Sequence, residues 1–180
     1  MDVVVPWVRC RERREAHVVA ETLEQVYGGH RQGLFTLALS ITRCAARAED
    51  AVQEAFVRMC RNASQDRKGD LVAYAYAAVR NAAIDQRRRV KAQRPKLESI
   101  FNGRHDAAAE REALEDERET VIAAAIEELP EEQREAVVLR VYAQLTFAQI
   151  AEVVDAPLQT VATRYRRALE RLRERLGRLV

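Results

Sequence analysis

The segment from Thr146 to Leu176 constrains the fold of this chain more than any other stretch of its sequence. It opens with Thr146-Phe147-Ala148-Gln149, a capping-box pattern in which a hydroxyl and an amide satisfy the first backbone N–H groups of a helix. Apolar residues then recur at offsets of three and four, which is the spacing of one helix face. Asp155-Ala156-Pro157 interrupts this pattern, and proline suits the first position of a new helix. The segment therefore predicts two helices joined by a tight turn.

The predicted second helix has an apolar side and a polar, basic side when its residues are placed at about 100° intervals. The apolar side holds Leu158, Val161, Tyr165, Ala168, Leu169, Leu172 and Leu176. The opposite side holds Gln159, Thr160, Thr163 and Arg167, flanked by Arg164 and Arg166. Such a helix can lie in the major groove of DNA, with its first turns at base edges and its cations at phosphates. An amphipathic helix with a solvated arginine face is the alternative interpretation.

Charge is segregated along the chain, although the net charge is only +2, from 30 basic and 28 acidic residues. A cationic run extends from Arg80 to Arg94, and acidic residues outnumber basic ones between Pro95 and Arg118. A nucleic-acid surface on this chain must therefore come from local clustering rather than from total charge. The hydrophobic content of 48% is sufficient for packed cores.

Several classes of protein are disfavoured by what the sequence lacks. No apolar run approaches the roughly 20 residues that span a bilayer, and Val3 to Val8 is too short for a secretory signal. We therefore expect a cytoplasmic protein with no membrane insertion. Cys10, Cys44 and Cys60 form no C-x-x-C pair, and the histidines complete no metal-ligand spacing, so neither a metal site nor a cofactor is expected. No acid, base and nucleophile cluster at useful spacing, so we expect no catalytic residues and no enzyme.

The fold class expected from the sequence is all-α. Ala, Leu, Glu and Arg dominate and recur with helical period, whereas strand signals are scarce. Breaks between helices are expected where glycine and proline occur, at Gly28-Gly29, Gly33, Gly69, Pro95, Gly103, Pro130 and Pro157. We expect two small helical domains and a flexible acidic linker, with an N-terminal extension at 1–17, a first domain at 18–92, the linker at 93–118 and a second domain at 119–180.

Within the first predicted domain, residues 48–61 form an amphipathic pattern. The residues predicted to face a core are Ala51, Val52, Ala55, Phe56 and Met59. The remaining side is an acidic and amide patch of Glu49, Asp50, Gln53 and Glu54. This patch has the charge to bind a basic partner, and a solvated helix face is the alternative interpretation.

A predicted helix at 71–90 follows a polar loop at 62–70 and combines aromatic with basic residues. Tyr74 and Tyr76 lie in its first half, and Arg87-Arg88-Arg89 lies near its end. Aromatic faces can stack on unpaired bases while nearby arginines hold the backbone of a nucleic acid. Two tyrosines on a helix are also typical of core or interface residues.

Three segments, in this order, resemble the sigma-70 family, and specifically the extracytoplasmic-function (ECF) group of bacterial sigma factors. Residues 48–56 resemble the region 2.2 helix, and residues 79–89 resemble the end of region 2.4. The third segment, from Glu128-Leu129-Pro130 to Thr163-Arg164, resembles region 4. The family often has a tryptophan after the loop that precedes region 2.4, whereas this chain has Ala73-Tyr74-Ala75-Tyr76.

This resemblance implies a promoter-specificity subunit with a sigma 2-like and a sigma 4-like domain. It implies that the clamp of core RNA polymerase is bound by Glu49, Asp50, Gln53 and Glu54. It implies that the minus-10 promoter element is bound and melted by residues that include Tyr74, Tyr76, Arg80, Asn81, Arg87, Arg88 and Arg89. The second domain would read the minus-35 element, and an anti-sigma factor would be a further partner.

Two other functions use the same residues. A dimeric helix-turn-helix regulator would bind a palindromic duplex site without core polymerase. A helical interaction protein would bind core polymerase without opening the promoter. The order of the acidic patch, the tyrosine and arginine helix and the helix-turn-helix favours the sigma factor.

Overall fold

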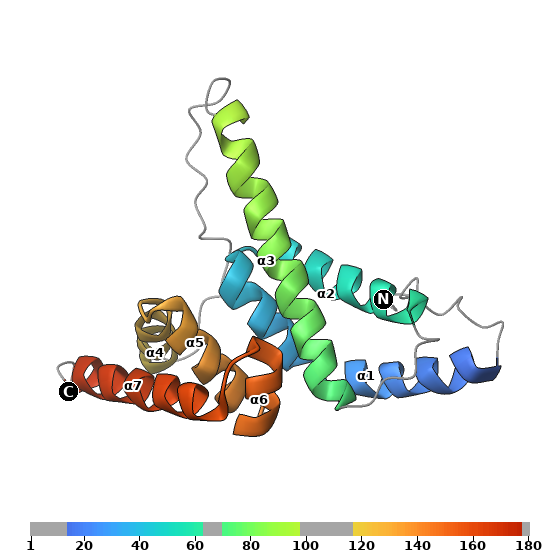
Figure 1. Cartoon of the computed structure of the whole chain (residues 1–180). Helices are drawn as coiled ribbons and strands as arrows, with labels where there is room; N and C mark the ends of the chain where they lie inside the picture. Colours follow the sequence, from blue (N-terminus) through green and yellow to red (C-terminus); the bar gives the residue numbers. More distant parts are fainter. Residues whose placement is uncertain (1–13, 63–69, 98–116, 178–180) are drawn as a thin grey trace.

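A computed structural model describes residues 14–62, 70–97 and 117–177 of the chain, and every regular element in these ranges is helical (Figure 1). The elements are α1 (Arg14–Thr42), α2 (Ala45–Arg61), α3 (Leu71–Leu97), α4 (Glu117–Glu127), α5 (Glu131–Val137), the π-helical turn η2 (Val138–Tyr142), α6 (Phe147–Val154) and α7 (Leu158–Leu176). The predicted all-α class is confirmed.

Helices α1, α2 and α3 pack against one another and form the first helical unit. The five apolar residues predicted for the inner side of α2, from Ala51 to Met59, are all buried. Helix α3 begins after Asp70, whose Oδ1 accepts hydrogen bonds from the backbone N–H groups of Val72 (2.8 Å) and Ala73 (3.3 Å). An aspartate before a helix can thus satisfy amides that have no partner within the first turn.

The breaks predicted at the glycines of α1 were wrong, because α1 continues through Gly28, Gly29 and Gly33. A glycine inside a helix costs roughly 1 kcal/mol relative to alanine, and packing of the buried residues of α1 outweighs that cost. Gly33 has a steric role, since a Cβ there would lie 2.2 Å from Tyr76 Oη and 3.1 Å from Ala143 Cα. Gly28 and Gly29 have open space around them, so packing does not require glycine at these two positions.

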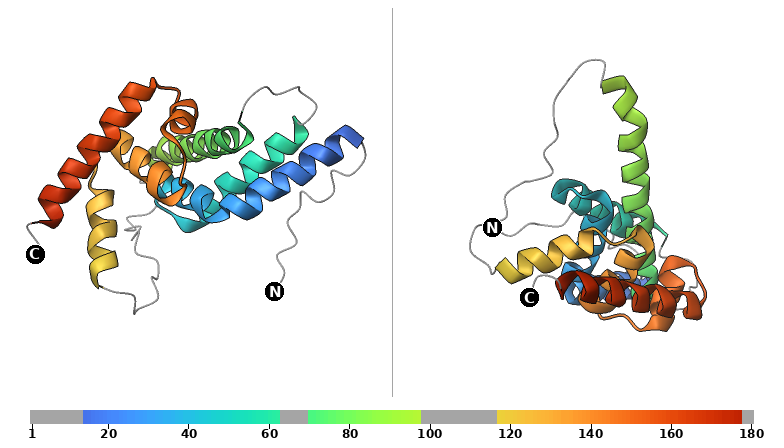
Figure 2. Two further views of the ribbon diagram at one scale, coloured as in Figure 1. Left: turned by 90° about the horizontal axis from the view of Figure 1, so that it is seen from below. Right: turned by 90° about the vertical axis from the view of Figure 1, so that its left-hand side faces the viewer.

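Helix α3 is longer than predicted and projects beyond the body of the molecule, as Figures 1 and 2 show. The expected break at Pro95 was wrong, because the helix ends two residues later, at Leu97. Proline removes one backbone donor and is least disruptive near a helix end, where few further hydrogen bonds depend on it. The predicted boundary at residue 92 therefore falls inside α3.

The second helical unit runs from α4 to α7. Within it, Arg134 of α5 caps the C-terminal end of α4. The Arg134 guanidinium donates to the carbonyl oxygens of Glu127 (2.6 Å), Leu129 (2.8 Å) and Ile126 (3.2 Å). These carbonyls lie at or just beyond the end of α4, where most carbonyls have no partner within the helix, although the N–H of Leu129 also donates to the Ile126 carbonyl at 3.2 Å. Burial lowers the pKa of Arg134 below its ordinary value. A small apolar cluster of Leu129, Val137 and Ala168 joins α5 to α7.

The two helical units share one hydrophobic core. Leu34, Leu37 and Val79 of the first unit belong to the same buried cluster as Leu139 and Ile150 of the second. The two units predicted on a tether thus pack together in this structure. The described residues leave out most of the predicted linker at 93–118, most of the predicted extension at 1–17, and residues 63–69 of the predicted polar loop at 62–70.

Candidate nucleic-acid interface

The helix-turn-helix begins with the predicted capping box. Thr146 N donates to Gln149 Oε1 at 2.8 Å, and Gln149 N donates to Thr146 Oγ1 at 3.2 Å. Helix α6 ends at Val154, and Asp155, with a φ of 50°, reverses the chain, while the N–H of Ala156 donates to the Ala151 carbonyl. Pro157 precedes the first residue of α7 instead of occupying that position as predicted, because its ψ of 141° is extended. The sequence thus placed both helices to within one residue.

Helix α7 is held in place by its apolar side and by an aromatic pair. Val161 and Ala168 are buried, and the rings of Phe147 and Tyr165 meet edge to face at 5.5 Å. Leu158 and Leu169 are 46% and 44% exposed, so the apolar side predicted from helical angles is only partly covered. The reading side of α7 is therefore fixed in direction by contacts with α6.

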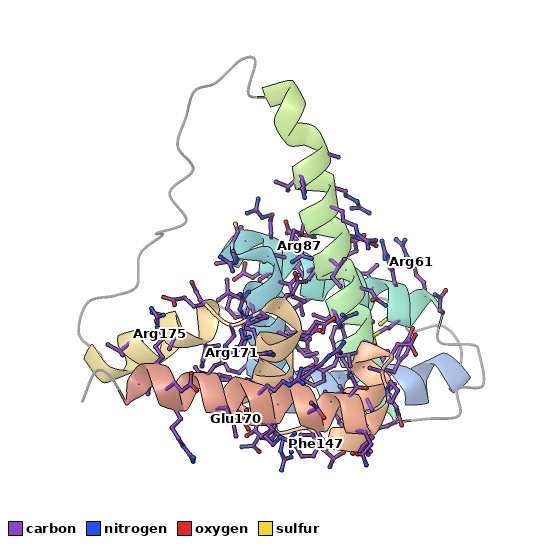
Figure 3. The ribbon with its side chains drawn as sticks, turned by 60° about the vertical axis from the view of Figure 1, so that its left-hand side comes forward. Arg61, Arg87, Phe147, Glu170, Arg171 and Arg175 are labelled. Atoms are coloured by element: carbon purple, nitrogen blue, oxygen red, sulfur yellow. The ribbon has the colours of Figure 1, made fainter. Side chains whose placement is uncertain are left out.

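The side of α7 predicted to read DNA is accessible. Gln159, Arg166 and Arg167 are exposed. The residues that line an open hollow on this side are Gln159, Thr160, Thr163, Arg164 and Arg167 of α7, together with Pro130, Glu132 and Gln133 beside or within α5. Figure 3 shows the length of α7, on which Glu170 and Arg171 are labelled. The structure therefore brings five of the six predicted reading residues to one concave surface.

Two acids lie beside the arginines of this reading side. Glu132 Oε2 is 2.9 Å from Arg164 Nη2, and Glu170 Oε1 is 3.9 Å from Arg166 Nε. Both glutamates are well exposed, so these ion pairs contribute little to stability. The sequence did not identify Glu132 as a neighbour of α7. Its position in the first turn of α5, two residues after Pro130, was the only local signal.

The first half of α3 places its two tyrosines differently. Tyr74 is half-buried, whereas Tyr76 is fully buried, with its Oη 3.4 Å from His30 Nδ1. Burial raises the pKa of Tyr76. Tyr76 is therefore a core residue in this arrangement, as the alternative interpretation held, and it reaches no unpaired base here.

Two arginines of α3, Arg80 and Arg87, face acids of α5. Arg80 makes a bidentate pair with Glu135, with Nε 2.5 Å from Oε1 and Nη2 3.2 Å from Oε2. Arg87 Nη2 lies 2.8 Å from Glu131 Oε1, and the hydrogen bond from this guanidinium holds the pKa of Glu131 below its ordinary value. Figure 3 labels Arg87 on α3 above the second unit.

The other predicted DNA-binding residues of α3 point to solvent. Asn81, Arg88 and Arg89 are exposed. Arg89 Nη2 lies 3.8 Å from Glu54 Oε1 of α2. The predicted set on α3 is therefore split, because Arg80 and Arg87 pair with α5 whereas Asn81, Arg88 and Arg89 are exposed.

The acidic and amide patch of α2 is on the outer side of the first unit. Glu49, Asp50 and Gln53 are exposed, and Glu54 is half-buried and lies 2.5 Å from Arg58. Three acids and an amide thus share one side of a helix whose other side is packed in the core. A partner with a basic surface could approach this patch directly.

Two further properties bear on the chemistry of the described residues. Within 14–62, 70–97 and 117–177, no three His, Cys, Asp or Glu side chains are grouped so that they could hold a metal ion. None of the helices in these same ranges combines the length and the apolar character of a transmembrane span.

Comparison with known proteins decides the family. The sigma-70 region 2 family matches residues 26–93, and the sigma-70 region 4 family matches residues 120–172. The ECF RNA polymerase sigma factor SigM of Mycobacterium tuberculosis is 33% identical over 170 residues, which cover 91% of this chain and 83% of that protein. The chain belongs to the sigma-70 family, in its ECF group. It is a sigma factor that directs RNA polymerase to promoters.

Further relatives agree with this assignment. The sigma factor SigK of Mycolicibacterium vanbaalenii is 28% identical over 172 residues, or 92% of this chain and 87% of that protein. The structure of RpoE with the anti-sigma factor NepR from Bartonella quintana matches with a TM-score of 0.68 and 22% identity, over 88% of this chain and 96% of that one. CnrH in complex with the cytosolic domain of CnrY matches with a TM-score of 0.63 and 19% identity, over 91% and 97%. The sigma factor therefore shares its fold, across both helical units, with solved sigma factors.

Proposed function

We propose that this sigma factor uses three separate surfaces to start transcription. The α2 patch binds the clamp of core RNA polymerase, the exposed side of α3 binds and opens the minus-10 element, and the reading side of α7 recognises the minus-35 element. The observation that carries the proposal is the concave reading side of α7, which follows a capped α6 and lies in the part of the chain matched by sigma-70 region 4.

The chemistry of α7 suits a division of labour between affinity and sequence choice. Gln159 and Thr160 lie in the first turn, where a recognition helix meets base edges, and an amide can pair with both N6 and N7 of adenine. Arg164 and Arg167 lie one to two turns later, where they would hold phosphates. Sequence preference thus depends on the start of the helix, and salt-sensitive affinity on its middle.

In the proposed role of α3, exposed arginines and an aromatic side chain act together. Arg88 and Arg89 are exposed and could hold a single strand, while Tyr74 lies half-buried near the start of the helix. Base stacking on an aromatic ring contributes about 1–3 kcal/mol per base. Tyr76 could take part only after the contacts that bury it are broken.

We further propose that this sigma factor has no catalytic activity of its own, acts in the cytoplasm, where core polymerase is found, and has an anti-sigma partner. The solved structure of RpoE is a complex with the anti-sigma factor NepR, and that of CnrH is a complex with the cytosolic domain of CnrY. An anti-sigma factor would cover the surfaces that bind polymerase, among them the patch on α2.

Run-off transcription with purified cognate core enzyme tests the function as a whole. Addition of the sigma factor should convert core enzyme, which is inactive at specific start sites, into an enzyme that yields transcripts of defined length. Permanganate should modify unpaired thymines near the minus-10 element in the same complexes. Duplex binding at a palindromic site with no effect on core enzyme would contradict the proposal.

The docking surface has its own test. Asp50→Lys with Glu54→Lys should weaken binding to core enzyme by at least about tenfold, since charge complementarity at a docking surface is reversed. Glu24→Lys with Glu152→Lys is the matched control, because these exposed acids lie outside the patch and give the same change in net charge. Circular dichroism should show the same helicity in both variants. Unchanged core affinity in the first variant would place the docking site elsewhere.

A further inference from the structure

The hollow beside the reading side of α7 has two walls of different character. Helix α7 forms one wall, and the start of α5 forms the other, with Pro130, Glu132 and Gln133. The two helices pack against each other, as Figure 2 shows. The α7 wall carries two cations, Arg164 and Arg167, whereas the α5 wall carries an acid and an amide. DNA that meets the reading side of α7 therefore also meets α5.

The two arginines of the α7 wall differ in their surroundings. Arg164 Nη2 lies 2.9 Å from Glu132 Oε2, and the Arg164 side chain is only 24% exposed. Arg167 is exposed, and it pairs with none of the described acids. The Glu132 side chain is 67% exposed, so its carboxylate is open to the solvent from which DNA approaches. A phosphate can meet Arg167 directly, but beside Arg164 it meets a negative charge.

The α5 wall presents a second oxygen without a donor. Gln133 Oε1 is buried and accepts no hydrogen bond from any residue in the described ranges. A buried acceptor without a partner carries an energetic cost, so the amide gains when it meets a donor. A carboxylate and an amide oxygen on one wall therefore favour N–H groups over phosphate oxygens. In the major groove, such N–H groups belong to the exocyclic amines of adenine and cytosine.

An acid in this position affects non-specific and specific binding differently. Non-specific binding depends on phosphate contacts, whereas the choice of sequence depends on base edges. Arg167 raises the affinity for every sequence alike, because it is free to meet a phosphate. Arg164 does so only after a phosphate has displaced Glu132, and the displaced carboxylate then repels that phosphate. This exchange is favourable when base contacts of Gln159 and Thr160 hold α7 fully docked in the groove.

We propose that Glu132 is a specificity-determining residue of this sigma factor, although it lies outside α7. Its carboxylate keeps Arg164 from the phosphates of non-promoter DNA and releases it only in the fully docked promoter complex. The start of α5 thus lowers the affinity for wrong sequences, which raises specificity without a further contact to the right one. This inference rests on the proposed role of α7 at the minus-35 element. It adds that repulsion from α5 makes part of the choice of promoter.

The variant Glu132→Gln tests the proposal, because it removes the charge and keeps the shape of the side chain. Two duplexes are compared, one that gives run-off transcripts with the wild-type holoenzyme and a shuffled duplex of the same length and composition. The variant holoenzyme should bind the shuffled duplex about threefold more tightly. The slope of log K against log salt concentration should steepen there by about 0.9, because Arg164 becomes free to hold one phosphate. The slope on the promoter duplex should stay the same, since Arg164 already holds a phosphate in that complex.

Glu128→Gln is the matched control. Glu128 also pairs with an arginine of α7, Arg175, but it does not line the hollow. The control makes the same change in net charge, and it should leave the preference for the promoter duplex and both slopes unchanged. Arg164→Gln combined with Glu132→Gln provides an independent measurement. It should restore the wild-type slope on the shuffled duplex, because no freed cation remains.

Two results would overturn the proposal: an unchanged slope on the shuffled duplex in Glu132→Gln, or an equal steepening in Glu128→Gln. Gln159→Ala separates this failure from failure of the proposed function. If Gln159→Ala lowers the preference for the promoter duplex and Glu132→Gln does not, α7 reads the minus-35 element without help from α5. If neither Gln159→Ala nor Arg167→Ala affects promoter binding, the proposed role of α7 is wrong, and the inference about Glu132 is overturned with it.

Discussion

The sides of α7 and α3 that are proposed to face DNA carry similar side chains but differ in access. On α7, Gln159 and Arg167 are exposed beside an open hollow. On α3, Tyr76 is fully buried and Arg80 is held by Glu135. The difference shows that residue type alone does not determine when a surface can bind DNA. The proposed minus-35 surface is accessible in this structure, whereas two residues of the proposed minus-10 surface, Tyr76 and Arg80, are covered.

The largest expected difference between the two sides, that of α3 and that of α7, is in the effect of a substitution on the free energy of unfolding. Tyr76→Ala should lower the free energy of unfolding by about 4 kcal/mol, because it leaves a cavity in the shared core. Gln159→Ala should change it by less than about 0.5 kcal/mol, since that side chain is exposed. Urea unfolding followed by circular dichroism measures both. Similar values for the two variants would mean that α3 is not buried in solution as it is here.

Double-mutant cycles should rank the ion pairs of the two faces. The coupling energy of Arg80 with Glu135 should reach about 2 kcal/mol, because the carboxylate is nearly buried and the contact is bidentate. The coupling energy of Arg164 with Glu132 should stay below about 0.5 kcal/mol, because Glu132 is 67% exposed. Equal coupling energies of the two pairs in urea unfolding would mean that Arg80 on α3 is no more enclosed in solution than Arg164 on α7.

Features that depend on nearby residues were predictable from the sequence. The capping box of α6, the turn into α7 and the buried side of α2 all follow from side-chain spacing within one or two helical turns. The reading side of α7 was predictable for the same reason, since its residues share one side of a single helix. Local patterns therefore specified the turn into α7, the buried side of α2 and the grouping of the predicted reading residues on one side of α7.

Features that depend on distant residues were not predictable. The partners Arg80 and Glu135 are 55 residues apart, and Asp70 and Gln149 are 79 apart, so no local pattern couples them. Gly33 was interpreted as a helix break. Its small size is instead needed to make room for the Tyr76 hydroxyl, and no local pattern shows this because Tyr76 belongs to a different helix. The core position of Tyr76 was predicted only as an alternative interpretation, because its neighbours His30 and Gly33 belong to a different helix. Helical period shows that a side is apolar or basic, but not which helix covers it.

Salt dependence should distinguish a phosphate-binding arginine on α7 from a solvated one. Arg167→Ala should weaken promoter binding by the holoenzyme and reduce the slope of log K against log salt concentration by about 0.9, the value for one lost phosphate contact. Arg175→Ala is the control, because that arginine pairs with Glu128 near the other end of α7 and should leave the slope unchanged. An unaltered slope in Arg167→Ala would favour the solvated face.

The smallest expected effect concerns pH and the cap of α3. The hydrogen bond from Gln149, together with those from the N–H groups of Ala73 and Val72, holds the pKa of Asp70 below its ordinary value of 3.8. A carboxylate with a depressed pKa in the folded state stabilises that state above its ordinary pKa, and this contribution is lost as the pH falls through the folded value. The stabilising effect of Asp70 should therefore be complete at pH 6 and should decline below about pH 4.

Asp70→Asn isolates this contribution from that of the other acids. Asparagine can still accept hydrogen bonds at the start of α3 but does not titrate, so the wild-type protein should exceed the variant in unfolding free energy at pH 6. This difference should shrink toward zero as the pH is lowered to 3, and urea unfolding at each pH measures it. Because Gln149 makes the largest contribution to the shift and belongs to the second unit, Gln149→Leu should reduce the pH dependence of the wild-type protein. A pH-independent difference between wild type and Asp70→Asn would show that the Asp70 carboxylate is not held by Gln149 of α6 in solution. The side of α3 would then be less covered by the second unit than it is in this structure, and closer to α7 in its accessibility.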